Sequence, residues 1–182
     1  TRIESSAASD VYKRQFEYVY ENIKSNIHLE SISGGTDLVS CFVTGNPLMD
    51  VYSGEIQCKA LGMEVDVFDE KGNSIENQKG ELVCKSSFPS MPLYFWNDHD
   101  NKKYFNSYFS KYKNIWYHGD YIEKTINGGY VIYGRSDATL NSGGVRIGTA
   151  EIYRVIENIT EVQESIAVEY KLKNDTQIIL FV

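Results

Sequence analysis

The chain has 182 residues, of which 42% are hydrophobic and 24% are charged; these are ordinary values for a folded domain and exclude disorder as the default state. This length suffices for one sizeable core, or for one core and the start of a second. The formal net charge of -7 argues against a sequence-independent nucleic-acid grip, because phosphate contacts need clustered Lys and Arg on one face.

The N-terminal part predicts a tail, a helix and a strand in that order. Residues 1–15 are small and polar without clear periodicity, and we interpret them as a non-native tail outside the fold. From 16 to 23 the apolar residues follow helical spacing and predict a short helix with one core-facing stripe. Residues 27–32 then roughly alternate apolar and polar side chains, which predicts a short strand that runs into Gly34 and Gly35.

The middle of the chain predicts a small β-rich unit. Strand-like runs alternate with turn signals from Val51 to about Tyr133. The expected strands are 63–68, 80–84, 116–117 and 130–133, with turns at 70–73 and 127–129. The stretch 96–112 is rich in Asn, Asp, Lys and aromatic residues, and predicts a loop and a helix whose aromatic side chains belong to the core.

The texture changes beyond Gly134, which indicates a second unit. Thr149 and Glu151 suit a helix start with an acidic first turn, so we expect a helix from 149 to about 159. Strand-like runs follow at 164–170 and 177–182, and because the second reaches the chain end, we expect the fold to continue beyond Val182. Helices and strands in this order predict an α+β fold.

Cysteines and histidines are scattered rather than grouped. The three cysteines include no CxxC pair and the three histidines stand far apart, so disulfide and zinc roles are not expected. We interpret the cysteines as reduced thiols of a cytoplasmic protein. Neither a signal-peptide pattern nor an apolar run of the roughly 18 residues that a membrane span requires is present.

Three stretches combine residue types that suit nucleotide chemistry. In 33–37 two glycines leave backbone N–H groups approachable, the hydroxyl of Thr36 can bind a phosphate oxygen, and the carboxylate of Asp37 can hold Mg²⁺. Asp120, just after a glycine, can accept both hydroxyls of a ribose, and Arg135 and Arg146 offer forked donors. Each stretch taken singly fits a tight turn or a solvated surface equally well.

The order and spacing of these stretches resemble one enzyme superfamily. GRSDATLNSGGVRIGTAEI at 134–152 is similar to the hinge motif of the adenylate-forming superfamily, which contains acyl-CoA synthetases, luciferases and peptide-synthetase adenylation domains. KGELVCKSSFPSMPLYFWND at 79–98 and SGGTDLVSCFVTGNP at 33–47 resemble more narrowly the acetoacetate-CoA ligase family. The resemblance implies that 16–136 is the β-rich C-terminal part of a large adenylation domain and that 137–182 begins a small α/β C-terminal domain.

The resemblance also implies roles for individual residues. Thr36 would contact the α-phosphate of ATP, Gly34 and Gly35 would also belong to the ATP/AMP-binding site, Asp37 would lie beside Mg²⁺, and Asp120 and Arg135 would bind the ribose. The superfamily usually has Glu where this chain has Asp37. Asp137 would be the hinge, Arg146 would approach the nucleotide phosphate, and Gly143 and Gly144 would lie where CoA enters; many relatives have Ser at the position of Gly143.

Gly34 bears on the acyl group. Relatives that activate acetate carry a tryptophan at the position that looks equivalent to Gly34, where it closes the acyl pocket, so glycine would leave room for a larger acid such as acetoacetate. The alternative is that Gly34 serves backbone geometry alone.

The implied reaction forms an acyl-adenylate and pyrophosphate from ATP and acetoacetate, and then acetoacetyl-CoA and AMP with CoA. The family's phosphate loop would lie before this chain and its catalytic lysine after it, so no catalytic residue is assigned here. Three other interpretations stay open: a module that binds adenylate or CoA without turnover, a piece of a synthetase for another short-chain acid, and an unrelated β-rich interaction domain.

Overall fold

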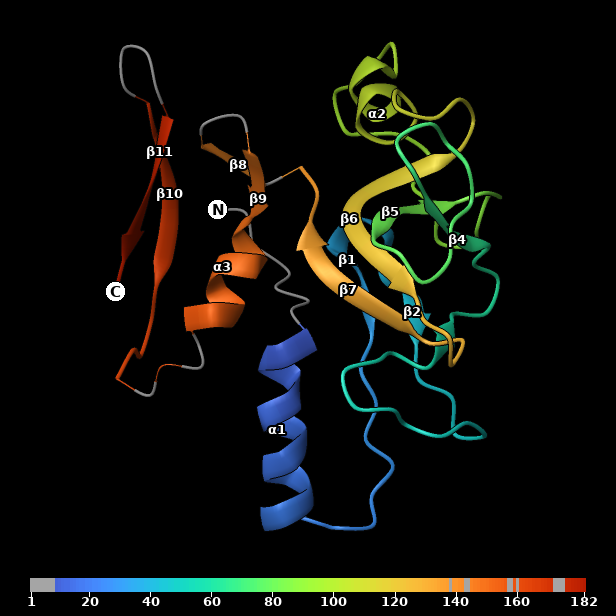
Figure 1. Cartoon of the computed structure of the whole chain (residues 1–182). Coiled ribbons are helices and arrows are strands. Elements are labelled where there is room, and N and C mark those ends of the chain that lie inside the picture. The colour runs from blue at the N-terminus through green and yellow to red at the C-terminus, as the bar shows by residue number, and fades with distance from the viewer. Residues whose placement is uncertain (1–8, 138, 143–144, 157–158, 160, 172–175) are drawn as a thin grey trace.

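The computed structural model describes residues 9–137, 139–142, 145–156, 159, 161–171 and 176–182 (Figure 1). The helices are α1 (Ser9–Asn22), the 3-10 helix η1 (Thr36–Leu38), α2 (Lys102–Tyr108) and α3 (Thr149–Ile156). The strands are β1 (Ser33–Gly35), β2 (Ser40–Thr44), β3 (Cys58–Lys59), β4 (Val65–Phe68), β5 (Gly80–Cys84), β6 (Trp116–Lys124), β7 (Tyr130–Arg135), β8 (Thr139–Ser142), β9 (Val145–Gly148), β10 (Ile166–Lys171) and β11 (Thr176–Phe181).

These strands form antiparallel sheets of different sizes. One sheet has the order β1-β2-β3 and another the order β4-β5-β6-β7, while β8-β9 and β10-β11 are two-stranded. Figure 1 shows β8, β9, α3 and the β10-β11 pair beyond β7, on the side away from β4 and β5. No helix in the described ranges combines the length and the apolar character that a membrane span requires.

The four-stranded sheet carries a cluster on each face, which explains why β5 is buried along its whole length. Because successive side chains of a strand point to opposite faces, Leu82 and Cys84 enter the main core with Trp116. Val83 points the other way and packs with Phe68 in a smaller cluster. The predicted strand 80–84 is therefore confirmed with the same bounds.

Helix α2 lies against β6 and is anchored by aromatic stacking (Figure 1). The ring of Tyr108 stacks on Trp116 with centroids 3.7 Å apart and an interplanar angle of 14°. At the start of α2 the buried carboxylate of Asp98 accepts the backbone N–H groups of Lys103 and Tyr104 at 3.1 and 2.8 Å. These two bonds satisfy donors that the first turn of a helix otherwise leaves free.

The structure corrects two expectations in the N-terminal part. Helix α1 begins at Ser9 rather than Phe16, so residues 9–15 are helical, while 1–8 lie outside the described residues. The strand predicted at 27–32 is wrong, because pairing begins only at Ser33. Its two outermost apolar side chains, Ile27 and Ile32, are exposed, so the alternation does not mark a buried face.

Other differences concern length and pairing. Strand β6 extends from Trp116 to Lys124, well beyond the predicted 116–117, and the hairpin of β8 and β9 was not expected. The helix predicted at 149–159 is confirmed over α3, Thr149–Ile156; residues 157 and 158 lie outside the described residues. The predicted runs 164–170 and 177–182 pair with each other as β10 and β11.

Candidate functional site

A bulge in β6 places the candidate ribose carboxylate. Tyr117 pairs with Val83 and Tyr121 pairs with Glu81, so 118–120 stand opposite Leu82 alone. Such a bulge locally redirects side chains, and bulges are frequent next to functional sites. Its middle residue, Gly119, has φ +82, in the left-handed region where glycine is favoured.

Asp120 and Arg135 face each other across the β6-β7 pair. The two residues are register partners, and Arg135 Nη1 lies 3.6 Å from Asp120 Oδ1 and donates to the His118 carbonyl at 3.1 Å. Only 4% of Asp120 is exposed. Burial raises the pKa of Asp120 to about 7; Arg135 opposes this and the carboxylate of Asp137 adds to it. The structure thus brings a buried carboxylate and a guanidinium together.

Arg135 also forms a salt bridge with Asp137, the predicted hinge residue. Its Nε donates to Oδ1 at 2.8 Å and its Nη2 lies 2.5 Å from Oδ2, which is the forked geometry of a strong arginine-carboxylate pair. The segment between them is fixed to the bulge as well, because the Ser136 N–H donates to the Gly119 carbonyl at 2.8 Å. The Ser136 and Tyr117 hydroxyls are 3.0 Å apart.

The glycine pair, Thr36 and Asp37 form a corner beside this bulge. Gly34 and Gly35 belong to β1, and the exposed Thr36 and Asp37 belong to η1. A Cβ added at Gly35 would lie 2.2 Å from Asp37 Oδ1 and 2.9 Å from His118 Cε1. The backbone of Gly35 is therefore directly adjacent to the β6 bulge, and two of the three predicted stretches meet there.

Gly34 is required by strand packing in this structure. A Cβ at this position would lie 2.2 Å from the Ser40 carbonyl oxygen and 2.5 Å from Cys41 Cα, both backbone atoms of β2. This geometry supports the alternative that Gly34 serves backbone geometry, while its role in an acyl pocket stays a prediction.

Asp37 has the chemistry of a Mg²⁺ ligand. Its Oδ2 accepts a hydrogen bond from the Tyr108 hydroxyl at 2.5 Å. Among the described residues, no group of three or more His, Cys, Asp or Glu side chains is arranged around a common metal position. A single carboxylate nevertheless fits Mg²⁺, which proteins often hold through one or two carboxylates and the phosphates of a nucleotide.

The remaining predicted site residues are only partly described. Gly143 and Gly144 lie outside the described residues. Arg146 is placed by its backbone, on β9 opposite Asn141 of β8.

Two residues of the site were not predicted. Tyr108 reaches Asp37 from α2, and no sequence pattern relates the two positions. His118 lies directly before the glycine and aspartate that were predicted, so its neighbourhood was the available signal. Both contact Trp116, through a ring stack with Tyr108 and an indole N–H that points at His118 Nδ1 over 3.4 Å.

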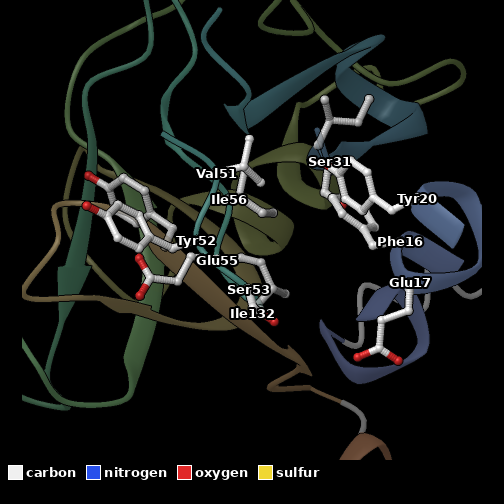
Figure 2. A pocket seen from close by; sticks show the side chains of 13 residues that line it. Phe16, Glu17, Tyr20, Ser31, Val51, Tyr52, Ser53, Glu55, Ile56 and Ile132 are labelled. Atoms are coloured by element: carbon white, nitrogen blue, oxygen red, sulfur yellow. The ribbon is translucent and has the colours of Figure 1, made fainter. Parts of the chain in front are cut away.

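A pocket of about 230 Å³ between α1 and the sheets is separate from this site. Figure 2 shows Phe16 and Tyr20 of α1 facing Val51 and Ile56 across the space. The pocket reaches β7 at Tyr130 and Ile132, away from the end that carries Arg135, and none of the predicted site residues lines it.

Known proteins similar to this chain are acetoacetyl-CoA synthetases, although no family model matches it. The protein of this name from Rhizobium meliloti is 52% identical over 181 residues, covering 100% of this chain and 28% of the relative. That from Rattus norvegicus is 46% identical over 178 residues, covering 97% of this chain and 26% of the relative.

Two solved structures share the fold. The acetoacetyl-CoA synthetase from Streptomyces lividans aligns with a TM-score of 0.76 and 40% identity over 85% of this chain and 24% of its own. The anthranilate CoA ligase AuaEII, solved with anthranoyl-AMP, aligns with a TM-score of 0.63 over 90% of this chain and 29% of its own; at 19% identity it supports the fold alone. The chain belongs by sequence and fold to the acetoacetyl-CoA synthetases, and it spans about a quarter of the length of the relatives that it matches.

Proposed function

We propose that the full-length protein containing this chain is an ATP-dependent acid-thiol ligase that activates acetoacetate and transfers it to CoA, giving acetoacetyl-CoA, AMP and pyrophosphate. The observation that carries the proposal is the meeting of the 33–37 corner with the β6 bulge, where His118 lies beside Gly35 and Asp120 faces Arg135. A corner suited to phosphate and a carboxylate-arginine pair suited to ribose then lie next to each other.

In the first half-reaction the acetoacetate carboxylate attacks the α-phosphorus of ATP and pyrophosphate leaves. Thr36 and the backbone of Gly35 would bind the α-phosphate. Asp120 would accept hydrogen bonds from the ribose hydroxyls, while Arg135 holds the Asp120 carboxylate in place. Asp37 would hold Mg²⁺, which neutralises phosphate charge when bound. The work of these residues is positioning, so their fixed contacts matter more than any proton transfer.

In the second half-reaction the CoA thiol displaces AMP. Asp137 would separate the large part at 16–136 from the small part at 137–182, and the small part would rotate about it. The forked Arg135-Asp137 pair supports this assignment, because it joins the ribose side of the site to the start of the moving part. Gly143 and Gly144 would face the entering CoA, and Arg146 would approach the nucleotide phosphate.

The chain alone is expected to bind nucleotide without turnover, because it spans only 26–28% of its relatives. Detectable acetoacetyl-CoA formation by the purified chain of 182 residues would contradict this expectation.

The test of the function is carboxylate-dependent exchange between ATP and pyrophosphate by the full-length protein, with acetoacetate compared with acetate, propionate and butyrate. Preference for acetoacetate would support both the reaction and the substrate. Preference for acetate would support adenylate formation and overturn the substrate, and exchange with none of the four acids would overturn both.

A further inference from the structure

His118 is buried where two sheets meet at the candidate site. Only 7% of the residue is exposed. Its ring packs edge-on against Phe42 of β2, with centroids 4.8 Å apart, while its own strand, β6, belongs to the four-stranded sheet. His118 therefore connects the sheet that carries the phosphate corner with the sheet that carries Asp120.

The contact with Trp116 determines which ring nitrogen of His118 carries the proton. An indole N–H can only donate, and Trp116 Nε1 lies 3.4 Å from His118 Nδ1. Burial lowers the pKa of His118 to about 4. The charge of Arg135 also lowers this pKa, whereas the carboxylates of Asp37 and Asp137 raise it. The ring is therefore neutral near pH 7. A neutral imidazole whose Nδ1 accepts has its proton on Nε2.

That Nε2–H faces both parts of the site. The nitrogen lies 3.7 Å from Asp120 Oδ2 and 3.1 Å from the position that a Cβ of Gly35 would occupy. The Nε2 side of the ring thus lies between the backbone of the phosphate corner and the ribose carboxylate.

We propose that His118 is a positioning residue for adenylate formation: its buried ring, with Nε2 on the side of Gly35 and Asp120, keeps the Gly34–Gly35 backbone and the Asp120 carboxylate at a fixed separation. The inference rests on the proposed function. In a nucleotide the α-phosphate and the ribose are joined covalently, so the groups that bind them must keep one spacing, and a change of that spacing weakens their joint binding of ATP. His118 would touch neither phosphate nor sugar.

The experiment compares two amides at this position in the full-length protein. In His118→Gln the longer side chain can bring an N–H to the place of Nε2, whereas the shorter amide of His118→Asn can replace only Nδ1. The matched control is His28→Asn, since His28 is half-exposed and pairs with Glu30 at 3.4 Å, outside the site. The measurement is acetoacetate-dependent exchange between ATP and pyrophosphate, with thermal melting of each variant.

We expect His118→Asn to raise the KM for ATP about tenfold with a much smaller fall in kcat, because the shorter side chain leaves the place of Nε2 empty and the separation is no longer fixed. His118→Gln should restore most of that KM, and His28→Asn should leave it unchanged. An equal KM in the Asn variant and the unsubstituted protein, or equal losses in the Asn and Gln variants that follow their melting temperatures, would overturn the proposal while leaving the function intact.

A second measurement does not depend on activity. Nitrogen-15 NMR of the histidine rings in this chain reports the tautomer directly, and the proton of His118 should be on Nε2. A proton on Nδ1 would overturn the proposal whatever the kinetics show. If the unsubstituted full-length protein supports no exchange with any acid, the proposed function fails and the positioning role fails with it.

Discussion

The hydroxyl of Tyr108 donates a hydrogen bond to Asp37 over 2.5 Å, although 71 positions separate the two residues in the chain. Burial, with the neighbouring Asp37, raises the pKa of Tyr108 well above its ordinary value, so the phenol stays protonated and remains a donor at neutral pH. Helix α2 therefore fixes the orientation of the one carboxylate assigned to Mg²⁺.

Replacing Tyr108 by Phe removes this donor and keeps the ring that stacks on Trp116. We expect the Mg²⁺ concentration for half-maximal exchange between ATP and pyrophosphate to rise several-fold in the full-length protein, while the free energy of unfolding falls by only about 1 kcal/mol. A Mg²⁺ titration of exchange and urea unfolding measure the two effects.

Tyr104→Phe is the matched control for that change. Tyr104 lies on the same helix, and its hydroxyl donates to the Pro92 carbonyl rather than to Asp37. Tyr104→Phe should lower the free energy of unfolding by a similar amount, and it should leave the Mg²⁺ concentration for half-maximal exchange unchanged. Equal shifts in the two variants would contradict the role of the Tyr108 hydroxyl.

The pH dependence of stability should contain two opposing contributions. Asp120, with a pKa raised by burial from 3.8 to about 7, holds a proton in the folded state that the unfolded chain releases, so its contribution to the free energy of unfolding falls as pH rises between these values. His118 has a pKa lowered by burial from 6.5 to about 4, so between these values it stays unprotonated in the folded state while the unfolded chain binds a proton. Its contribution to the free energy of unfolding therefore rises as pH rises from about 4 to 6.5.

Asp120→Asn removes the first contribution and should expose the second. Relative to the unsubstituted chain, the variant should gain stability steadily as pH rises from 4 towards 7. Urea unfolding at several pH values in this interval measures the difference. Parallel curves for the two proteins would show that the pKa of Asp120 is not raised.

The two glycines of β1 should respond differently to alanine. At Gly34 the added Cβ meets backbone atoms of β2, so Gly34→Ala must separate the strands, and we expect a loss of about 2–3 kcal/mol in the free energy of unfolding. At Gly35 it meets side chains rather than backbone: the exposed Asp37 can rotate away, whereas the buried ring of His118 must shift slightly. Gly35→Ala should therefore cost less stability but raise the KM for ATP.

Gly54→Ala serves as the reference for these variants. No atom lies within 4 Å of a Cβ at Gly54, and its φ of +83 makes alanine costly for conformational reasons alone, by about 1 kcal/mol. Urea unfolding ranks the three variants, and exchange kinetics test Gly35→Ala. A loss at Gly34 no larger than that at Gly54 would contradict the packing interpretation.

Lys111 neutralises the charge of a buried carboxylate, that of Glu81. Its Nζ pairs with Glu81, whose side chain is 7% exposed, and lies 4.6 Å from the ring centroid of Tyr117. Lys111→Met should lower the free energy of unfolding by about 2 kcal/mol, less than for a fully buried pair because the lysine is itself partly exposed. Adding Glu81→Gln should recover most of that loss.

The control for this pair is an exposed one. Lys124 lies 2.5 Å from Glu76, whose side chain is 63% exposed, so Lys124→Met should change the free energy of unfolding by less than about 1 kcal/mol. Similar losses for Lys111→Met and Lys124→Met in urea unfolding would show that burial of Glu81 does not matter.

Sequence patterns predicted the elements whose burial is regular. Strand 80–84 was predicted with the bounds of β5, and the two runs near the C-terminus were predicted as strands that the structure pairs. The strand at 27–32 was wrong because alternation indicates only that one face differs from the other, and does not show that a partner strand exists. The length of β6 could not be predicted, since its bulge interrupts the alternation on which such a prediction depends.

The same distinction applies to the site. Thr36, Asp37, Asp120 and Arg135 stand in local patterns that nucleotide chemistry makes recognisable. The network around Trp116 depends on contacts between α2, β6 and η1, and no spacing along the chain records these contacts.

Gly119 has a consequence for the path between the two proposed parts of the molecule. A Cβ at this position would lie 2.8 Å from Arg135 Nη2, the nitrogen that donates a hydrogen bond to Asp137. Any other amino acid at 119 must therefore displace the guanidinium from the carboxylate of Asp137, the proposed hinge. A single added methyl group would weaken the link between Arg135, on the proposed ribose side, and Asp137, the proposed hinge, while Thr36, Asp37 and Asp120 stayed in place.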